Sequence, residues 1–151
     1  MSRMSVMLLL TGLILGPTWA VLAEEPKTSD DARIAVQAIC PVTGIKLGDH
    51  GAPVAAKLEG EDLFLCCKGC VGKPAKPEHL KTIHANMAKA QGTCPVSGKA
   101  LTAESPSLVV EGRTVFVCCP GCPGKVKSDP AAAIAKVDAQ YAKAVPAKTA
   151  K

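Results

Sequence analysis

Residues 40–44 read Cys-Pro-Val-Thr-Gly and residues 65–70 read Leu-Cys-Cys-Lys-Gly-Cys, and together they form the cysteine frame that decides the fold. Residues 94–98 repeat its opening as Cys-Pro-Val-Ser-Gly, and residues 117–122 repeat its close as Val-Cys-Cys-Pro-Gly-Cys. All eight cysteines lie in the two frames: Cys40, Cys66, Cys67 and Cys70, then Cys94, Cys118, Cys119 and Cys122. Four thiols within about thirty residues indicate a soft-metal site, a disulfide framework or thiol redox chemistry.

The duplication extends beyond the cysteines. Glu-Gly pairs at 59–60 and 111–112 separate two short strand-like runs in each copy, and they predict β-hairpins because glycine supplies the positive φ of a tight turn. An amphipathic helix is expected after each frame, beginning at Pro77 and again at Asp129-Pro130. Its apolar stripes repeat at a fixed offset: Leu80, Ile83 and Met87, then Ile134, Val137 and Tyr141. We therefore expect an α+β fold of two tandem, cysteine-clustered ββα modules.

The chain divides into five predicted segments. The first 23 residues have a positively charged start, a short apolar run and small residues before a cleavage site, which is typical of a signal peptide. No strong pattern marks the stretch just after it or the C-terminal tail, and both are expected to be flexible. Gly92 is expected to end the first helix, so that almost no linker separates the copies. The segments are a signal peptide 1–23, a flexible segment 24–37, module 1 at 38–92, module 2 at 93–144 and a flexible tail 145–151.

The spacing of the cysteines favours a metal site in each copy. Cys67-x-x-Cys70 and its repeat have the spacing with which two thiolates hold one tetrahedral ion. Cys40 and its repeat, each on a Pro-containing turn, can swing back as a third ligand. Cys66 and Cys118 are the expected fourth ligands, so that each copy would form a four-cysteine cluster. They rank last because successive side chains of a strand point to opposite faces, which predicts that the two thiols of each Cys-Cys pair point away from each other. A thiolate set selects soft or borderline ions, Zn²⁺ or Cu⁺ above all.

The order of these features resembles the TRASH/YHS-type small metal-binding modules. Both copies show Cys-Pro-x-x-Gly, a glycine-turned hairpin, an aromatic-x-Cys-Cys-x-Gly-Cys run and a following helix. The resemblance implies a treble-clef-like or zinc-ribbon-like fold and a role in heavy-metal trafficking, resistance or sensing. Its pattern of one cysteine followed by Cys-x-x-x-Cys maps onto two sets of residues: Cys40, Cys66 and Cys70, and Cys94, Cys118 and Cys122. In this chain Cys67 and Cys119 add a thiol to that pattern.

Two other uses of the cysteines remain open. An even cysteine count in a small exported chain also fits a disulfide-stapled interaction module that binds no metal. Thiol–disulfide catalysis is less favoured, although residues 119–122 read Cys-Pro-Gly-Cys, because neither copy has room for a thioredoxin-like βαβ unit. The chain has no paired catalytic carboxylates, Ser-His-Asp set or phosphate-binding glycine loop, and we do not expect an enzyme.

Composition limits the partners. The net charge is +5 and only 3% of residues are aromatic. Scattered lysines without aromatic residues indicate a solvated surface rather than a nucleic-acid face. The histidines, His50, His79 and His84, are expected on the surface. The expected partners are a soft metal ion and a metal transporter or another exported protein, in the periplasm or outside the cell, with no membrane span once the signal is removed.

Overall fold

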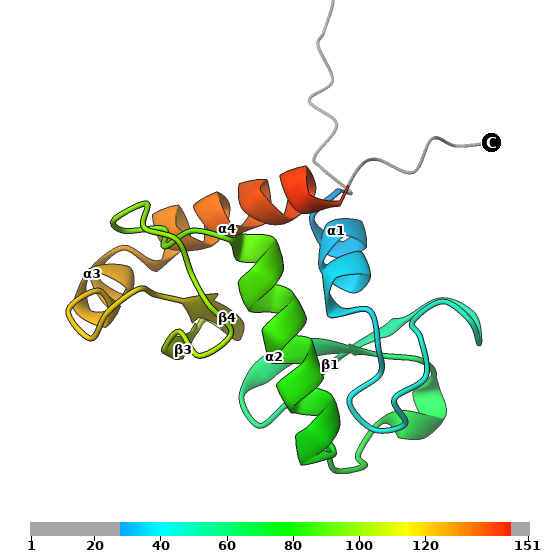
Figure 1. The fold of residues 1–151 in the computed structure, drawn as a ribbon. Helices are drawn as coiled ribbons and strands as arrows, with labels where there is room; N and C mark the ends of the chain where they lie inside the picture. The colour runs from blue at the N-terminus through cyan, green and yellow to red at the C-terminus, as the bar shows by residue number, and fades with distance from the viewer. Residues whose placement is uncertain (1–27, 146–151) are drawn as a thin grey trace, which may run out of the picture.

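The computed structural model describes residues 28–145, in which helices alternate with two β-hairpins (Figure 1). The elements are α1 (Thr28–Gln37), β1 (Val54–Leu58), β2 (Glu61–Leu65), the short 3-10 helix η1 (Lys68–Cys70), α2 (Pro77–Gln91), β3 (Ser107–Val110), β4 (Arg113–Phe116), α3 (Pro123–Ser128) and α4 (Pro130–Ala144). The mixed α+β class is thus confirmed. The predicted signal peptide (1–23) and residues 146–151 of the predicted tail lie outside the described residues.

Each hairpin turns at its Glu-Gly pair, as predicted. In the first sheet Val54 pairs with Leu65, and in the second Ser107 pairs with Phe116. Both turn residues have positive φ, 52° and 88° in the first hairpin and 50° and 77° in the second. Two successive positive φ angles are those of a type I′ turn, which matches the twist of a two-stranded sheet. The second strand of each hairpin ends just before a Cys-Cys pair.

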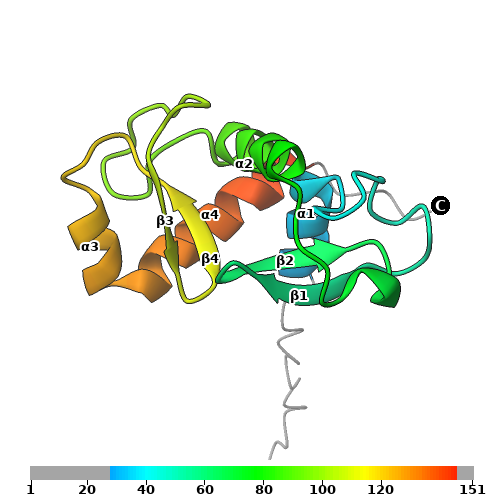
Figure 2. The same cartoon turned by 90° about the horizontal axis from the view of Figure 1, so that it is seen from below.

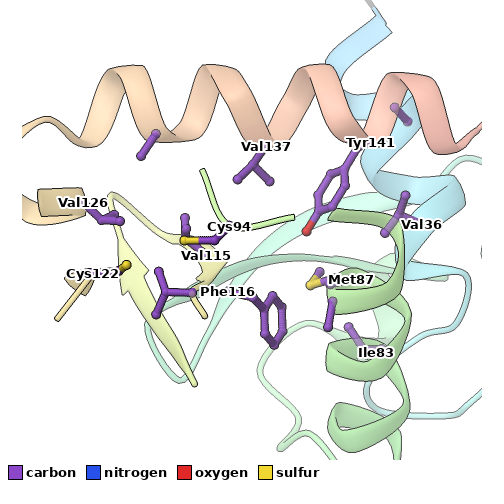
Figure 3. Close-up of a cluster of buried hydrophobic side chains, with 14 of the residues drawn as sticks. Val36, Ile83, Met87, Cys94, Val115, Phe116, Cys122, Val126, Val137 and Tyr141 are labelled. Carbon is purple, nitrogen blue, oxygen red and sulfur yellow. The ribbon is translucent and has the colours of Figure 1, made fainter. Parts of the chain in front are cut away.

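The two long helices also begin and end where the sequence predicts. Gly92, with a φ of 66°, ends α2. The Asp129 side chain accepts a hydrogen bond from the Ala132 N–H (3.1 Å) at the start of α4. Their apolar faces are buried, and Figure 3 shows Tyr141 of α4 pointing toward Met87 of α2, with Val137 pointing into the same cluster. The short α3 has no counterpart in the first copy.

Helix α1 occupies a segment that the sequence predicted to be flexible. Its inner face buries Ala32 and Val36 in the main core. The helix ends at Gln37, three residues before Cys40, just as α2 ends at Gln91, three residues before Cys94. The repeat therefore includes a helix that precedes each cysteine frame.

A buried glutamine ties each of these helices to its hairpin. Gln37 Oε1 accepts from the Phe64 N–H (2.8 Å), and its Nε2 donates to the Phe64 carbonyl (2.7 Å). Gln91 makes the same pair of bonds with Phe116, at 3.0 Å and 2.7 Å. Both amides are fully buried, so each satisfies strand groups that would otherwise lack partners.

The two copies share one core. Helix α4 lies across α1 and α2 (Figure 1), and the main apolar cluster combines residues of both copies, among them Val36, Leu63, Val115 and Tyr141. The hairpins meet where the Asp62 N–H donates to the Gly112 carbonyl (2.7 Å), as can be followed in Figure 2. Helix α2 follows the first frame and precedes the second. Because α2 serves both copies, the finer description as two tandem ββα modules stays a prediction.

Candidate metal centre

The first cysteine frame closes into a compact group of sulfurs. The Sγ atoms of Cys40, Cys66 and Cys70 all lie within 4.8 Å of one another, and those of Cys66 and Cys70 are 3.7 Å apart. A tetrahedral ion with metal–sulfur distances of about 2.3 Å holds its sulfurs about 3.8 Å apart. The three side chains are buried. We call these residues the first triad; its spacing and donor type fit one soft ion.

A tight turn presents Cys40 to the other two sulfurs. The Gly44 N–H donates to the Cys40 carbonyl (2.9 Å), and the Cys40 N–H donates to the Ile45 carbonyl (2.8 Å). Gly44 adopts a φ of 73°, a conformation that side-chain-bearing residues rarely take. The Cys-Pro-x-x-Gly sequence is thus a loop that folds back on its own cysteine. Helix η1 follows the Cys66-Cys67 pair directly, and Cys70 is its last residue.

The second frame builds the same arrangement. Cys94, Cys118 and Cys122 form a second triad within 4.8 Å, with 3.9 Å between the sulfurs of Cys118 and Cys122. Its turn repeats the bonds of the first, since the Gly98 N–H donates to the Cys94 carbonyl (2.8 Å). In Figure 3, Cys94 and Cys122 lie beside Val115 and Val126 of the main core.

The extra thiols adjoin the triads without completing them. Cys67 Sγ lies 4.0 Å from that of Cys66 and 3.9 Å from that of Cys70. Cys119 Sγ lies 3.5 Å from that of Cys122. These distances place Cys67 and Cys119 where a fourth ligand can be recruited by a small side-chain movement.

The structure thus changes the order of the ligand candidates. The Cys-x-x-Cys spacing favours Cys67 and Cys119 over Cys66 and Cys118, whereas the triads contain Cys66 and Cys118. The predicted divergence of the vicinal pair is wrong in the first copy, where the two sulfurs are 4.0 Å apart. The 3-10 helix η1 folds the chain back directly after Cys67, and it brings the Cys70 sulfur to 3.7 Å from that of Cys66 and 3.9 Å from that of Cys67. The residues of each triad are the three that match the cysteine pattern of the TRASH/YHS-type modules.

One thiol in each triad is favoured as a thiolate. Burial alone would raise the pKa of Cys40, but hydrogen bonds from the Thr43 hydroxyl and from nearby backbone N–H groups, that of Cys66 among them, lower it to about 6. The pKa of Cys94 is likewise about 6, because the N–H of Cys118 and both the N–H and hydroxyl of Ser97 outweigh burial. Each site therefore offers one preformed negative sulfur to a cation.

Cys70 and Cys122, one sulfur in each triad, hold their protons because their pKa values are raised. Burial and then the thiols of Cys66 and Cys67 raise the pKa of Cys70 to about 12. The hydrogen bond with Cys119, followed by burial, raises the pKa of Cys122 to about 12. A cation that displaces these protons relieves the repulsion between neighbouring thiolates, so the site is electrostatically suited to a metal ion.

The histidines play structural parts in the first copy. The Nδ1–H of His79 donates to the Pro41 carbonyl (3.1 Å), and His84 Nε2 lies 2.9 Å from a Glu61 carboxylate oxygen. His50 is exposed. Among the described residues, the groups spaced to hold a metal ion contain cysteines alone.

All eight cysteines are free thiols in the structure. No helix within residues 28–145 is both long enough and apolar enough to cross a bilayer. Comparison with protein-family models, curated proteins and solved structures found no match to this chain.

Proposed function

We propose that this protein binds soft metal ions, one at each triad, and sequesters, stores or delivers them outside the cytoplasm. The observation that carries the proposal is that two sets of three cysteine sulfurs converge to within 4.8 Å, in the same way in both copies. Bringing thiolates together is energetically unfavourable, because neighbouring negative charges repel each other and buried ones lose their hydration. A metal ion removes both costs.

The donor set points to Zn²⁺ or Cu⁺. Three thiolates without carboxylate or imidazole exclude Mg²⁺ and Ca²⁺, which require oxygen ligands. Zn²⁺ would take four ligands, and Cys67 and Cys119 supply the fourth sulfur of a four-cysteine cluster. Cu⁺ is a soft ion that thiolate ligands select. The choice of ion therefore depends on whether these adjoining thiols close on it.

The setting of the protein is part of the same proposal. The signal-like residues 1–23 support export to the periplasm or beyond the cell. The resemblance of both frames to TRASH/YHS-type modules supports a treble-clef-like classification and a role in metal handling or resistance. A transporter or another exported protein is then the natural donor or acceptor of the ion.

Titration of the reduced protein with Zn²⁺, and separately with Cu⁺ under anaerobic conditions, tests the proposal. We expect two equivalents to bind. Cys70→Ser and Cys122→Ser, which remove the same position from each triad, should each bind one equivalent, and the double variant none. Lys68→Ser, an exposed change beside Cys67, is the matched control and should retain two.

The competing function, a disulfide-stapled interaction module, predicts another outcome. Protein isolated from its export compartment would then contain no metal and no free thiols, and the reduced chain would lose its fold without gaining metal. The structure shows sulfurs separated by 3.5 Å or more, far beyond the ~2.05 Å of a disulfide bond.

A further inference from the structure

The two triads differ systematically in how far solvent reaches them. Cys66 is buried whereas its counterpart Cys118 is half-buried, and Cys67 is half-buried whereas Cys119 is exposed. The loops beside the cysteines also differ, since Val42 is buried whereas its counterpart Val96 is half-buried. Two further aligned pairs show the same trend, with the second-copy member more exposed: Gly44 and Gly98, Leu47 and Leu101. The other ligands are equally buried in both copies, so the difference lies at the vicinal cysteines and on the loop beside them.

The first site is covered by His79. A Cβ placed on Gly44 would lie 2.7 Å from His79 Nε2, so the imidazole rests on the cysteine loop. The ring is held there by its bond to the Pro41 carbonyl (3.1 Å), and the Lys76 N–H donates to the same carbonyl (2.9 Å). The chain that leaves Cys70 therefore closes back onto the loop that holds Cys40.

The second site lacks this cover. Counting 54 residues on from His79, the same offset that relates the two helix stripes, leads to Ala133. A Cβ placed on Gly98 would meet nothing within 4 Å. The Pro95 carbonyl is reached instead by Lys136 Nζ (3.0 Å), the end of a flexible side chain. After Cys122 the chain enters α3 at Pro123 rather than folding back over the loop.

We infer that the two sites divide the work: the second exchanges metal with a thiol-bearing acceptor, and the first retains it. This inference rests on the proposed metal binding. Exchange at a thiolate site proceeds when an incoming thiolate binds the metal and a resident one leaves. The acceptor thiol loses its proton, the departing cysteine gains one, and the metal keeps its oxidation state. Cys118 and Cys119 lie where such a thiol can approach, whereas Cys66 is shielded.

The test follows the loss of metal from each site in the full mature protein. The chain is loaded with two Zn²⁺ ions and mixed with excess dimercaptosuccinate, and native mass spectrometry counts the metals retained over time. We expect the two-metal form to decay quickly to a one-metal form that persists. Cys122→Ser should leave only the slow ion and Cys70→Ser only the fast one. Removing the cover with His79→Ala should accelerate the slow loss by several-fold, up to about tenfold, which is the lower end of the effect of a group bonded directly to a metal ligand, because His79 is hydrogen-bonded to the residue next to Cys40.

The matched control is His50→Ala, the same substitution at an exposed histidine of the first copy, and it should alter neither rate. Two ions lost at one common rate, or a fast phase that disappears with Cys70→Ser, would overturn the division of labour. So would a His79→Ala variant that binds two ions and loses both at the wild-type rates. Failure to bind any zinc would instead contradict the proposed function itself, so the two failures are distinguishable.

Discussion

At the scale of single residues, the same short polar side chains recur in both copies and explain why the sites have their shape. Gln37 and Gln91 fix each hairpin relative to the helix that precedes the first cysteine of its frame. Thr43 and Ser97 reach the sulfurs of Cys66 and Cys118, at 3.5 Å and 3.0 Å. The triads are therefore positioned by hydrogen bonds from outside the cysteine set, and this should show in stability.

Gln91→Leu should destabilise the metal-free protein by about 2–4 kcal/mol, because the N–H and carbonyl of Phe116 both lose the buried amide with which they pair. Urea unfolding under reducing conditions measures the change. Lys89→Leu, an exposed substitution on the same helix, is the control and should shift the free energy of unfolding by less than about 0.5 kcal/mol. An equal effect of the two substitutions would contradict the role assigned to Gln91.

The His84–Glu61 pair predicts a pH dependence of stability. The hydrogen bond to the Glu61 carboxylate raises the pKa of His84, against the opposing effect of burial. Since the folded-state pKa exceeds the unfolded one, the contribution is complete below about pH 6.5 and is lost as the pH rises through the raised pKa. The ring is only half-buried, so the effect is at most about 1 kcal/mol.

The measurement is the difference in unfolding free energy between the wild type and His84→Gln from about pH 5.5 to 8.5. Taking the difference cancels the titration of the cysteines, which both proteins share. We expect the wild-type advantage to shrink as the pH rises. A difference that stays constant across the range would show that the pair adds no charge-dependent stability.

At the scale of elements, much could be predicted from the sequence because local chemistry specifies it. The Glu-Gly turns, the Gly92 terminus of α2 and the Asp129-Pro130 start of α4 each depend on one or two residues. Helix α1 was not predicted because its apolar stripe is short. The signal that could have found it is Gln37, which lies three residues before Cys40 just as Gln91 lies three residues before Cys94. The sequence ranks Cys66 and Cys118 last among the ligand candidates, whereas their sulfurs lie within the triads. Which sulfurs converge is set by tertiary packing, which the cysteine spacing does not encode.

The hairpin turns offer a matched pair of substitutions. Gly60 and Gly112 both have positive φ, so alanine at either should cost about 1–2 kcal/mol in backbone strain. A Cβ on Gly60 meets nothing, whereas one on Gly112 would collide with the Asp62 carboxyl group. We therefore expect Gly112→Ala to lower the thermal midpoint clearly more than Gly60→Ala. Equal shifts would contradict a fixed contact between the Asp62 carboxyl group and the second turn.

At the scale of the whole molecule, one core serves two sites. Helix α2 belongs to both copies, and the main cluster draws on α1, α4 and both hairpins. The first triad has its own smaller cluster with Phe64 and Leu65, while Cys94 and Cys122 of the second lie in the main one. Since neither copy buries its apolar face alone, the described fold should behave as one cooperative unit.

Cooperative unfolding is checked with two probes on the metal-free, reduced mature protein. Far-ultraviolet circular dichroism follows all helices, and Tyr141, the only tyrosine and a buried residue of α4, reports by its fluorescence on the shared core. We expect the two denaturation curves to coincide. A tyrosine transition that is separate from the helical one would show that the copies unfold independently.

The most direct test of the central claim is a parallel count of metal and thiols in the protein as isolated from the cells that produce it. Elemental mass spectrometry gives the ions per chain, and thiol titration after denaturation and chelation gives the free cysteines. Our account predicts two soft ions and eight free thiols per chain, matching the two triads and the eight unpaired cysteines. A protein with no metal and no free thiols would contradict it.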